Sequence, residues 1–593
     1  MSTEVVPAVT TASSASLPKH DLGLAGSSYL GDLPSAYRRL FWAVALILGL
    51  LRTLDARYEV SADGISYIEM GDAYFRGDWK MAINAYWSPL YSWLIVLPKH
   101  LFGLSLYYEP TSVHLVNFLI FVGVLFSFEF FLSNLLSGIS LIDGERLGAL
   151  QPWALRLIGY SLFLYSAAYW LSTDVVSPDL CVEGLVLLAA GIILQIARGG
   201  AGWANFAKLG VILGIGYLTK VVLFPLAFVF LLCCFFAAPN RRQNVAKCFL
   251  AFLIFLLIAT PYILVLSRAK GRFTYGDVGK IAYATYVDGV PLAVHWQGAQ
   301  VIYGTPVHAT RKVLEHPAVF EFAQPVGGSY PAWYDPSYWY EGIAPKFDAR
   351  KEAAHVHQHL HFFVGLLSQQ GEIVAGFLAL FLIASRRKVF FLRWLREAFV
   401  WVPAIVALGA YTLIHLETRF LPGFLLLFWL SLFAALVIPD SAISWKVAQC
   451  VSLAIVLTVG ARVLWTASIE LGHLAGGRTN ISWNVAEQLR RDGVQPGDKV
   501  GSIGFAFDGY WAHLAGVTIV AEIPESDAGA FWIADPETKE RVLNMFAKFG
   551  AKAVVSNRVP PYTLPPGWTL ITGWAPSGNA SYFVRPIGDT AAR

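Results

Sequence analysis

The sequence predicts a multi-pass α-helical membrane protein of about 11 transmembrane helices with a C-terminal extracytoplasmic α/β domain. Of its 593 residues, 56% are hydrophobic and only 14% are charged, whereas soluble domains carry about 25% charged residues. Apolar segments long enough to span a bilayer recur over most of the chain, and a more polar region follows them. The formal net charge of +4 is too small to indicate a nucleic-acid partner.

The apolar segments define a membrane part over residues 38–471. They lie at 40–55, 112–136, 153–171, 178–197, 203–219, 221–238, 247–267, 361–385, 397–414, 419–437 and 447–467. Residues 1–37 are rich in Ser, Ala and Thr, so we expect a disordered cytoplasmic tail. Ser88–Phe102 is also apolar but is interrupted by prolines, which favours an amphipathic helix on the outer surface.

Basic residues set the expected orientation, because Lys and Arg favour the cytoplasmic side. Arg38 and Arg39 precede the first span, and Arg198 and Arg241 lie in later loops of the same side. The protein is therefore expected in the plasma (inner) membrane, with its N-terminus in the cytoplasm. The loops at 56–110 and 268–360 and the tail at 472–593 would then lie outside.

The tail has the pattern of a separate α/β domain. Trp483–Arg491 reads as a helix, and Asp535-Pro536 is a cap followed by proline at the start of another helix that Gly550 closes. Strands are expected at Lys499–Ile503, Thr518–Ile523, Ala553–Ser556 and Tyr582–Val584. All five cysteines fall in apolar segments, so we expect no structural disulfide.

Carboxylates at the outer ends of the spans are the first candidate functional residues. Asp63 follows the first span, and Asp174 and Asp179 share the short turn between the third and fourth. Carboxylates beside a membrane are costly unless they are paired, solvated or functional. The alternative is helix capping: Asp63 lies beside Ser61 in a cap-like sequence, and Asp179 starts a helix where the dipole favours an acid.

Cations form a second group of candidates. Lys220, His415 and Arg419 lie at or near the outer ends of spans, with Glu417 among them. Arg419 could extend to lipid headgroups. Its planar fork also suits a phosphate.

The long outer loop contributes aromatic residues and histidines. Trp333 and Tyr334 belong to the run YPAWYDPSYWY, which suits either an interfacial belt or stacking on sugar rings. The run HVHQHLH could bind zinc or could simply be an interfacial segment that enters the next span. Its histidines are His355, His357, His359 and His361.

Several short motifs in this order resemble the GT-C superfamily of membrane glycosyltransferases, and specifically its protein O-mannosyltransferase and aminoarabinose transferase group (family 39). The motifs are SADGISYIEMGDA, WSPLYSWLI, SPDL, GYLTK and HLETRFLPG, and the resemblance covers roughly residues 38–440. The family usually has two adjacent acidic residues in the first loop, whereas Gly64 follows Asp63 here.

The resemblance implies an inverting transfer of a hexosyl or pentosyl group from a polyprenyl-phosphate sugar to a hydroxyl-bearing glycan, lipid or protein. It implies Asp63 as general base, assisted by Asp179 or Asp174. It implies that the donor phosphate is bound by Arg419, Lys220 and His415, and we expect substrate contacts from Glu69, Trp87, Tyr91, Trp333, Tyr334 and Glu417. No cofactor is required, and a divalent metal at the histidine run is left open.

Two other functions fit parts of the sequence. One is a transporter or flippase of lipid-linked saccharides, although such proteins place ionisable groups near the midplane and contain inverted repeats. The other is a non-enzymatic membrane anchor that presents the C-terminal domain for binding.

Overall fold

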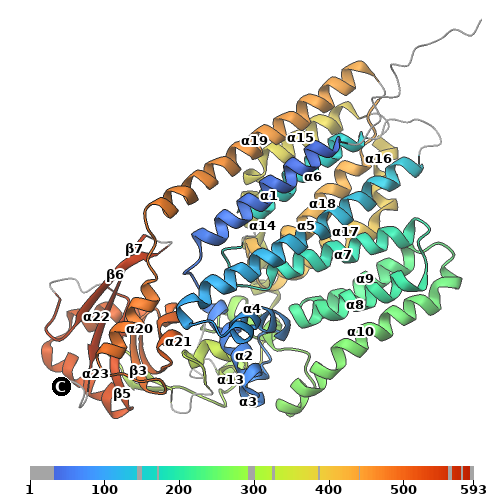
Figure 1. The fold of residues 1–593 in the computed structure, drawn as a ribbon. Helices are drawn as coiled ribbons and strands as arrows, with labels where there is room; N and C mark the ends of the chain where they lie inside the picture. Colours follow the sequence, from blue (N-terminus) through green and yellow to red (C-terminus); the bar gives the residue numbers. More distant parts are fainter. Residues whose placement is uncertain are drawn as a thin grey trace, which may run out of the picture.

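A long helical bundle carries a mixed sheet and its helices at one end (Figure 1). The computed structural model describes residues 33–142, 150–169, 173–291, 301–322, 327–384, 387–439, 441–558, 564–575 and 578–587. Most of the tail expected to be disordered, residues 1–32, lies outside the described residues.

Each predicted apolar segment forms a helix, or two in the segment 361–385, over most of its described residues. The helices are α1 (Ser35–Asp55), α5 (Glu109–Ile142), α6 (Pro152–Tyr169), α7 (Asp179–Ala197), α8 (Trp203–Thr219), α9 (Leu223–Ala237), α10 (Arg241–Ala269), α14 (Ala349–Gln369), α15 (Gly371–Ile383), α17 (Ala398–Ile414), α18 (Pro422–Ala435) and α19 (Ala442–Ala475). Large side chains such as Phe128, Phe131 and Phe255 fill the space between them.

The number of membrane spans is smaller by length and composition. Among the described residues, α5, α7, α10 and α19 are long and apolar enough to cross a membrane. Two pairs bent by 77°, α14 with α15 and α16 (Arg387–Arg396) with α17, raise the count from four to at most six. Helices such as α9, with 15 residues, extend about 22 Å and are shorter than a typical hydrocarbon core. The predicted count of about 11 therefore stays a prediction.

Residues 56–110, which are expected on the outer side and are called the first outer loop below, fold into short helices against the end of the bundle. Helix α2 (Ala62–Arg76) is capped by Ser61, whose Oγ accepts from the Gly64 N–H at 3.3 Å. Asp63 is therefore not the capping residue, and its carboxylate can make other contacts. The amphipathic helix expected near Ser88–Phe102 is α4 (Pro89–Phe102), which buries Tyr91 and exposes Phe102.

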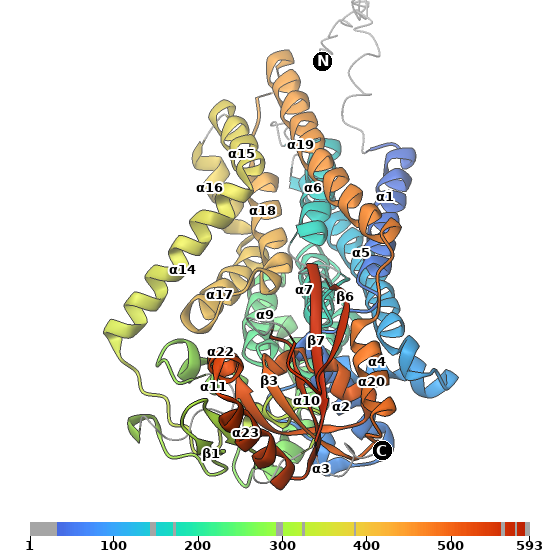
Figure 2. The ribbon, with the colours of Figure 1, turned by 90° about the vertical axis from the view of Figure 1, so that its left-hand side faces the viewer.

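The described strands form one mixed sheet, part of which is labelled in Figure 2. Its order is β1 (Arg311–Leu314), β2 (Val319–Glu321), β4 (Thr518–Pro524), β3 (Lys499–Gly504), β5 (Ala551–Ser556), β7 (Gly578–Pro586) and β6 (Thr569–Ala575). Strand β3 is parallel to β4 and β5, and the other pairs are antiparallel. All four strands expected in the tail are confirmed.

Helices of the tail flank this sheet. Helix α20 (Ile481–Arg491) and helix α23 (Pro536–Lys548) lie where the sequence predicts helices, and Asp535 caps α23 by accepting from the Thr538 N–H at 2.8 Å. Strands β1 and β2 come from the long outer loop, with Phe320 paired to Glu522 of β4. The sheet is therefore shared between loop and tail, and the domain boundary at residue 472 stays a prediction. The five cysteines are free thiols.

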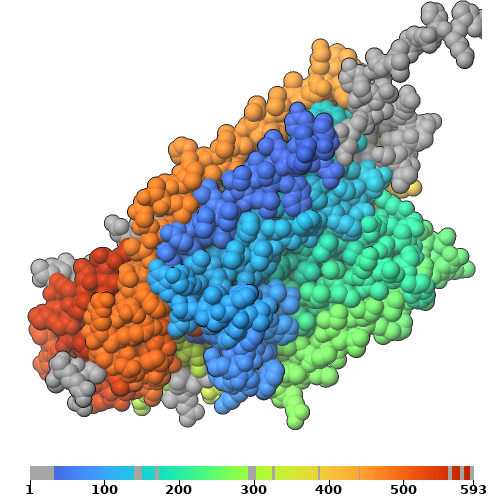
Figure 3. Space-filling model, in the orientation of Figure 1, coloured from blue at the N-terminus to red at the C-terminus, as the bar shows by residue number. Residues whose placement is uncertain are grey.

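The tail also contacts the first outer loop through a buried ionic cluster. His513 of α21 (Tyr510–Ala515) contacts Glu109 through Nε2 at 2.8 Å and Glu69 through Nδ1 at 3.1 Å. Lys99 bridges Glu109 and Asp72, at 2.5 Å from each. In Figure 3 the orange tail lies directly against these blue segments. Glu69, Asp72, Lys99, Glu109 and His513 are called the docking cluster below.

Candidate active site

A cavity of about 210 Å³ lies among the start of α2, the start of α7, the end of α17 and the segment that joins α17 to α18. Its charged and polar lining includes Asp63, Asp179, Lys220, His415, Glu417 and Arg419. Its aromatic lining consists of Tyr67, Tyr86, Trp87, Tyr286, Trp333, Tyr411 and Phe420. Residues from distant parts of the chain thus meet in one space.

Arg419 is the central cation of this cavity. Its Nη2 lies 2.8 Å from Asp63 Oδ2, and its Nε lies 2.6 Å from Glu417 Oε2. Asp179 is farther away, with Oδ2 at 3.8 Å from the same Nε. The guanidinium is therefore held by carboxylates inside the protein, and it does not extend toward lipid headgroups.

Lys220 is the second cation, and it lies in an extended break between α8 and α9. Its Nζ is 2.6 Å from Asp179 Oδ1 and 3.7 Å from the centre of the Phe420 ring. Asp179 also accepts a hydrogen bond from Ser177 at 2.8 Å. The break in the helix turns the lysine side chain into the cavity, where it shares Asp179 with Arg419.

Trp333 orients the Asp63 carboxylate from the other side. Its indole Nε1 donates to Asp63 Oδ1 at 3.1 Å. The Trp333 carbonyl accepts from Ser66 Oγ at 2.9 Å and from Trp87 Nε1 at 3.2 Å. These bonds hold the long outer loop against the first outer loop. Because Trp333 contacts one oxygen of Asp63 and Arg419 contacts the other, the orientation of the carboxylate is fixed.

Glu417 links Arg419 to His415. His415 Nε2 lies 2.8 Å from Glu417 Oε1, and the His415 ring stacks on Tyr286 of α11 (Val278–Tyr286) with centroids 3.6 Å apart. Burial alone would raise the pKa of Glu417, but the His415 hydrogen bond and the Arg419 charge lower this pKa to about 2. Glu417 is therefore an anion at every physiological pH.

Tyr67, Trp87 and Trp333 line the cavity beside the carboxylates and are called the aromatic wall below. The ring centroids of Trp87 and Trp333 are 5.6 Å apart, and those of Tyr67 and Trp87 are 5.1 Å apart. Tyr67 lies one helical turn after Asp63, so the spacing of four residues could have predicted that both face the cavity. Tyr286 is distant in sequence from the other candidates, whereas Tyr411 lies four residues before His415.

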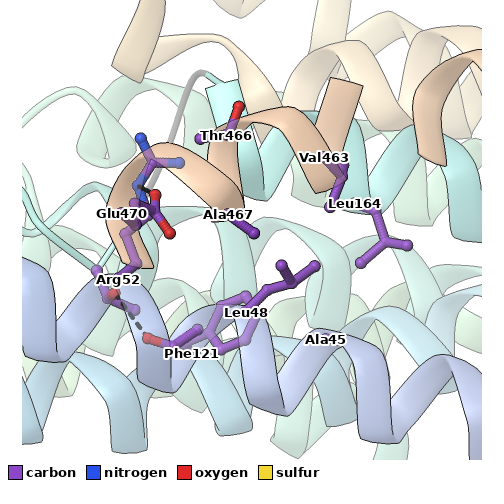
Figure 4. A pocket seen from close by; sticks show the side chains of 11 residues that line it. Ala45, Leu48, Arg52, Phe121, Leu164, Val463, Thr466, Ala467 and Glu470 are labelled. Carbon is purple, nitrogen blue, oxygen red and sulfur yellow. Dashed lines mark hydrogen bonds and ion pairs between the residues drawn. The ribbon is translucent and has the colours of Figure 1, made fainter. Parts of the chain in front are cut away.

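Asp174 does not line this cavity, although the sequence grouped it with Asp179. Its carboxylate faces Arg52 of α1 at 3.6 Å, and Arg52 also lies 3.2 Å from Glu470 of α19. Arg52 and Glu470 face each other beside a small separate cavity of about 30 Å³ between α1 and α19 (Figure 4). Asp174, in the turn before α7, and Asp179, at the start of α7, thus face different cations.

Three residues expected to contact substrate have other partners. Tyr91 is fully buried and donates to Asn117 Oδ1 at 2.7 Å. Tyr334 donates to the Met81 carbonyl at 2.6 Å, and Glu69 belongs to the docking cluster. Tyr334 and Glu69 both border a different cavity of about 340 Å³ between α2 and the tail.

The histidine run lies on α14 and forms two pairs one helical turn apart. His355 contacts the Ile414 carbonyl at 3.1 Å, and His359 contacts the Thr412 carbonyl at 2.7 Å. His357 and His361 contact each other at 3.2 Å on the exposed side. Half of the run therefore tethers α14 to the end of α17.

A different group has the geometry of a metal site in the described part of the chain. The ligand atoms of Asp72, Glu109 and His513 lie within 4.8 Å of one another. Lys99 already bridges Asp72 and Glu109 in this group. The Lys99 ammonium supplies the positive charge that these carboxylates need, so ion pairs account for the geometry of the group.

Comparison with known proteins finds similar solved structures but no matching sequences. No family model matches the sequence, and no curated protein matches it. The chain is similar to the crystal structure of ArnT from Cupriavidus metallidurans, with a TM-score of 0.40 and 14% identity over 93% of this chain and 98% of that one. It is also similar to the Archaeoglobus fulgidus oligosaccharyltransferase, with a TM-score of 0.48 and 14% identity over 92% of this chain and 72% of that one.

The second of these neighbours is an oligosaccharyltransferase. The identities are low and both TM-scores lie below 0.5. Nothing about donor, acceptor or mechanism follows from such a likeness, and these have to be argued from the residues of the cavity.

Proposed function

We propose that the protein is an inverting glycosyltransferase on the outer face of the plasma membrane. It moves a hexosyl or pentosyl group from a polyprenyl-phosphate sugar to a hydroxyl-bearing glycan, lipid or protein. The observation that carries the proposal is the meeting of an acid from the first loop, an acid from the start of α7 and two cations in one cavity, with Arg419 2.8 Å from Asp63.

Asp63 acts as the general base in this mechanism. It takes the proton of the acceptor hydroxyl while that oxygen attacks the anomeric carbon. The bond between this carbon and the phosphate oxygen breaks, and its electron pair stays with the phosphate. A positioned base of this kind contributes about 10²–10⁴ in rate. The indole of Trp333, 3.1 Å from Oδ1, holds the carboxylate in one orientation.

Arg419 and Lys220 stabilise the leaving group. The lipid phosphate departs as an anion and needs no general acid, but its growing charge needs fixed cations nearby. Asp179, which is 3% exposed, accepts from Lys220 at 2.6 Å and lies near Arg419. Its role is to keep the two cations together before the donor arrives. The aromatic wall offers flat faces on which a sugar ring can stack.

The direct test replaces the base without changing its shape. Asp63→Asn and the matched control Asp174→Asn would be purified as full chains and supplied with radiolabelled polyprenyl-phosphate hexoses and pentoses in membranes. Loss of at least about 100-fold in transfer is expected for Asp63→Asn. The Asp174 variant should stay active because that carboxylate faces Arg52 outside the cavity. Transfer by Asp63→Asn at near wild-type rate would show that the base is wrongly assigned.

A further inference from the structure

Tyr411 carries a polar group that no other part of the described structure uses. The residue lies on α17, is 7% exposed and lines the cavity that contains Asp63 and Arg419. Its hydroxyl oxygen is buried and has no hydrogen-bond partner within the described residues. A buried hydroxyl without a partner destabilises a folded protein, and because Tyr411 lines the cavity, a ligand bound there can supply the partner.

The position of this hydroxyl indicates the ligand. The Tyr411 ring stacks on Phe420, with centroids 5.1 Å apart, and the Lys220 ammonium lies 3.7 Å from the centre of the same Phe420 ring. The Arg419 guanidinium lies 5.3 Å from the centre of this ring as well. The free donor thus lies with the two cations of the cavity.

The other donors of this region are already engaged. Lys220 donates to Asp179, and Arg419 donates to Asp63 and Glu417. A phosphate that enters the cavity meets cations whose hydrogen bonds are partly taken by carboxylates. The Tyr411 hydroxyl, which has no partner in the described structure, can donate a hydrogen bond to a phosphate oxygen without breaking an existing one. A hydrogen bond to an anionic oxygen is stronger than one to a neutral oxygen.

We propose that the Tyr411 hydroxyl donates a hydrogen bond to the phosphate of the polyprenyl carrier and so selects the phosphorylated lipid together with Arg419 and Lys220. This inference rests on the proposed function and adds to it a specificity-determining residue that the sequence motifs do not contain. The apolar lining around Tyr411 would accommodate the first part of the lipid chain.

The test compares Tyr411→Phe with wild type in two measurements on the purified full chain. Without ligand, the melting temperature of Tyr411→Phe should equal or exceed that of wild type, because the variant loses a buried hydroxyl that has no partner. The Kd for polyprenyl monophosphate should rise about 10-fold, since the hydrogen bond to a charged oxygen is lost. Binding of the unphosphorylated polyprenol should be the same in both proteins.

Ser452→Ala is the matched control. Ser452 of α19 also has a buried hydroxyl without a partner in the described structure, but it does not line the cavity. Its Kd for polyprenyl monophosphate should equal that of wild type. An unchanged Kd in Tyr411→Phe, or a lowered melting temperature with unchanged Kd, would overturn this inference and leave the proposed function standing. Failure of wild type to bind polyprenyl monophosphate would overturn both.

Discussion

The guanidinium of Arg419 and the carboxylate of Asp63 lie 2.8 Å apart although 356 positions separate them in the chain. Asp63 belongs to the first turn of α2, and Arg419 belongs to the short segment between α17 and α18. The candidate site therefore forms only when the N-terminal and C-terminal helices of the bundle have packed together. Every variant of one residue should change the environment of the other.

Replacement of Arg419 by Lys tests this relationship. Lysine keeps the charge but lacks the planar fork, so it cannot contact Asp63 and Glu417 through separate nitrogens as Arg419 does. We expect transfer to fall about 100-fold with little change in folding. Arg541→Lys, at an exposed position of α23, is the control. Equal loss in both variants would contradict a specific role for the fork.

Trp333→Phe removes one hydrogen bond to the base and keeps an aromatic ring. Because the indole N–H orients Asp63 Oδ1 at 3.1 Å, the turnover number should fall about 10-fold while the Kd for the lipid donor stays unchanged. Steady-state kinetics with separate donor titration measures both quantities. Trp79→Phe, at an exposed site in the first loop, should behave as wild type. A change in donor Kd alone would mean that Trp333 binds the donor and does not position the base.

The docking cluster should make stability depend on pH. Burial alone would lower the pKa of His513, but the carboxylates of Glu109 and Glu69 raise it from 6.5 to about 10. A raised pKa means that the protonated form stabilises the fold, fully below pH 6.5 and progressively less as the pH approaches 10. The melting-temperature difference between wild type and His513→Gln should therefore be largest near pH 6 and shrink toward pH 10. A difference that grows with pH would contradict a cationic His513.

The histidine run should divide into a structural pair and a dispensable pair. His355 and His359 contact the carbonyls of Ile414 and Thr412, so the double substitution to Ala removes two tethers between α14 and α17. We expect a loss of about 2 kcal/mol in stability. The double substitution of His357 and His361, which are exposed, should cost less than about 0.5 kcal/mol. Thermal unfolding compares them, and equal losses would show that the two tethers contribute nothing.

Local patterns in the sequence predicted the helices and part of the site. Hydropathy is a property of neighbouring residues, so every apolar segment could be recognised as a helix. The meeting of Asp63, Asp179 and Arg419 was expected from the order of the motifs. Asp174 was misplaced because the direction of a side chain in a turn depends on the cation that it faces, here Arg52 of another helix.

Long-range pairing explains what local patterns missed. Strands β1 and β2 have only 4 and 3 residues, and they are strands because β2 pairs with β4, about two hundred positions later. Tyr411 reaches the cavity through the packing of α17, and the sequence motifs do not contain it. Contacts of this kind are set by tertiary structure and cannot be inferred from a window of sequence.

The sheet that the long outer loop shares with the tail connects the tail to the candidate site. The loop that contributes β1 and β2 continues to Trp333, and on the way the Ser329 carbonyl accepts from the Ile519 N–H of β4 at 2.8 Å. A molecule bound at the edge strand β1 therefore acts, through this loop, on the Trp333 indole that contacts Asp63. Deleting the tail would remove this connection, and antibodies raised against the β1 edge should act as inhibitors.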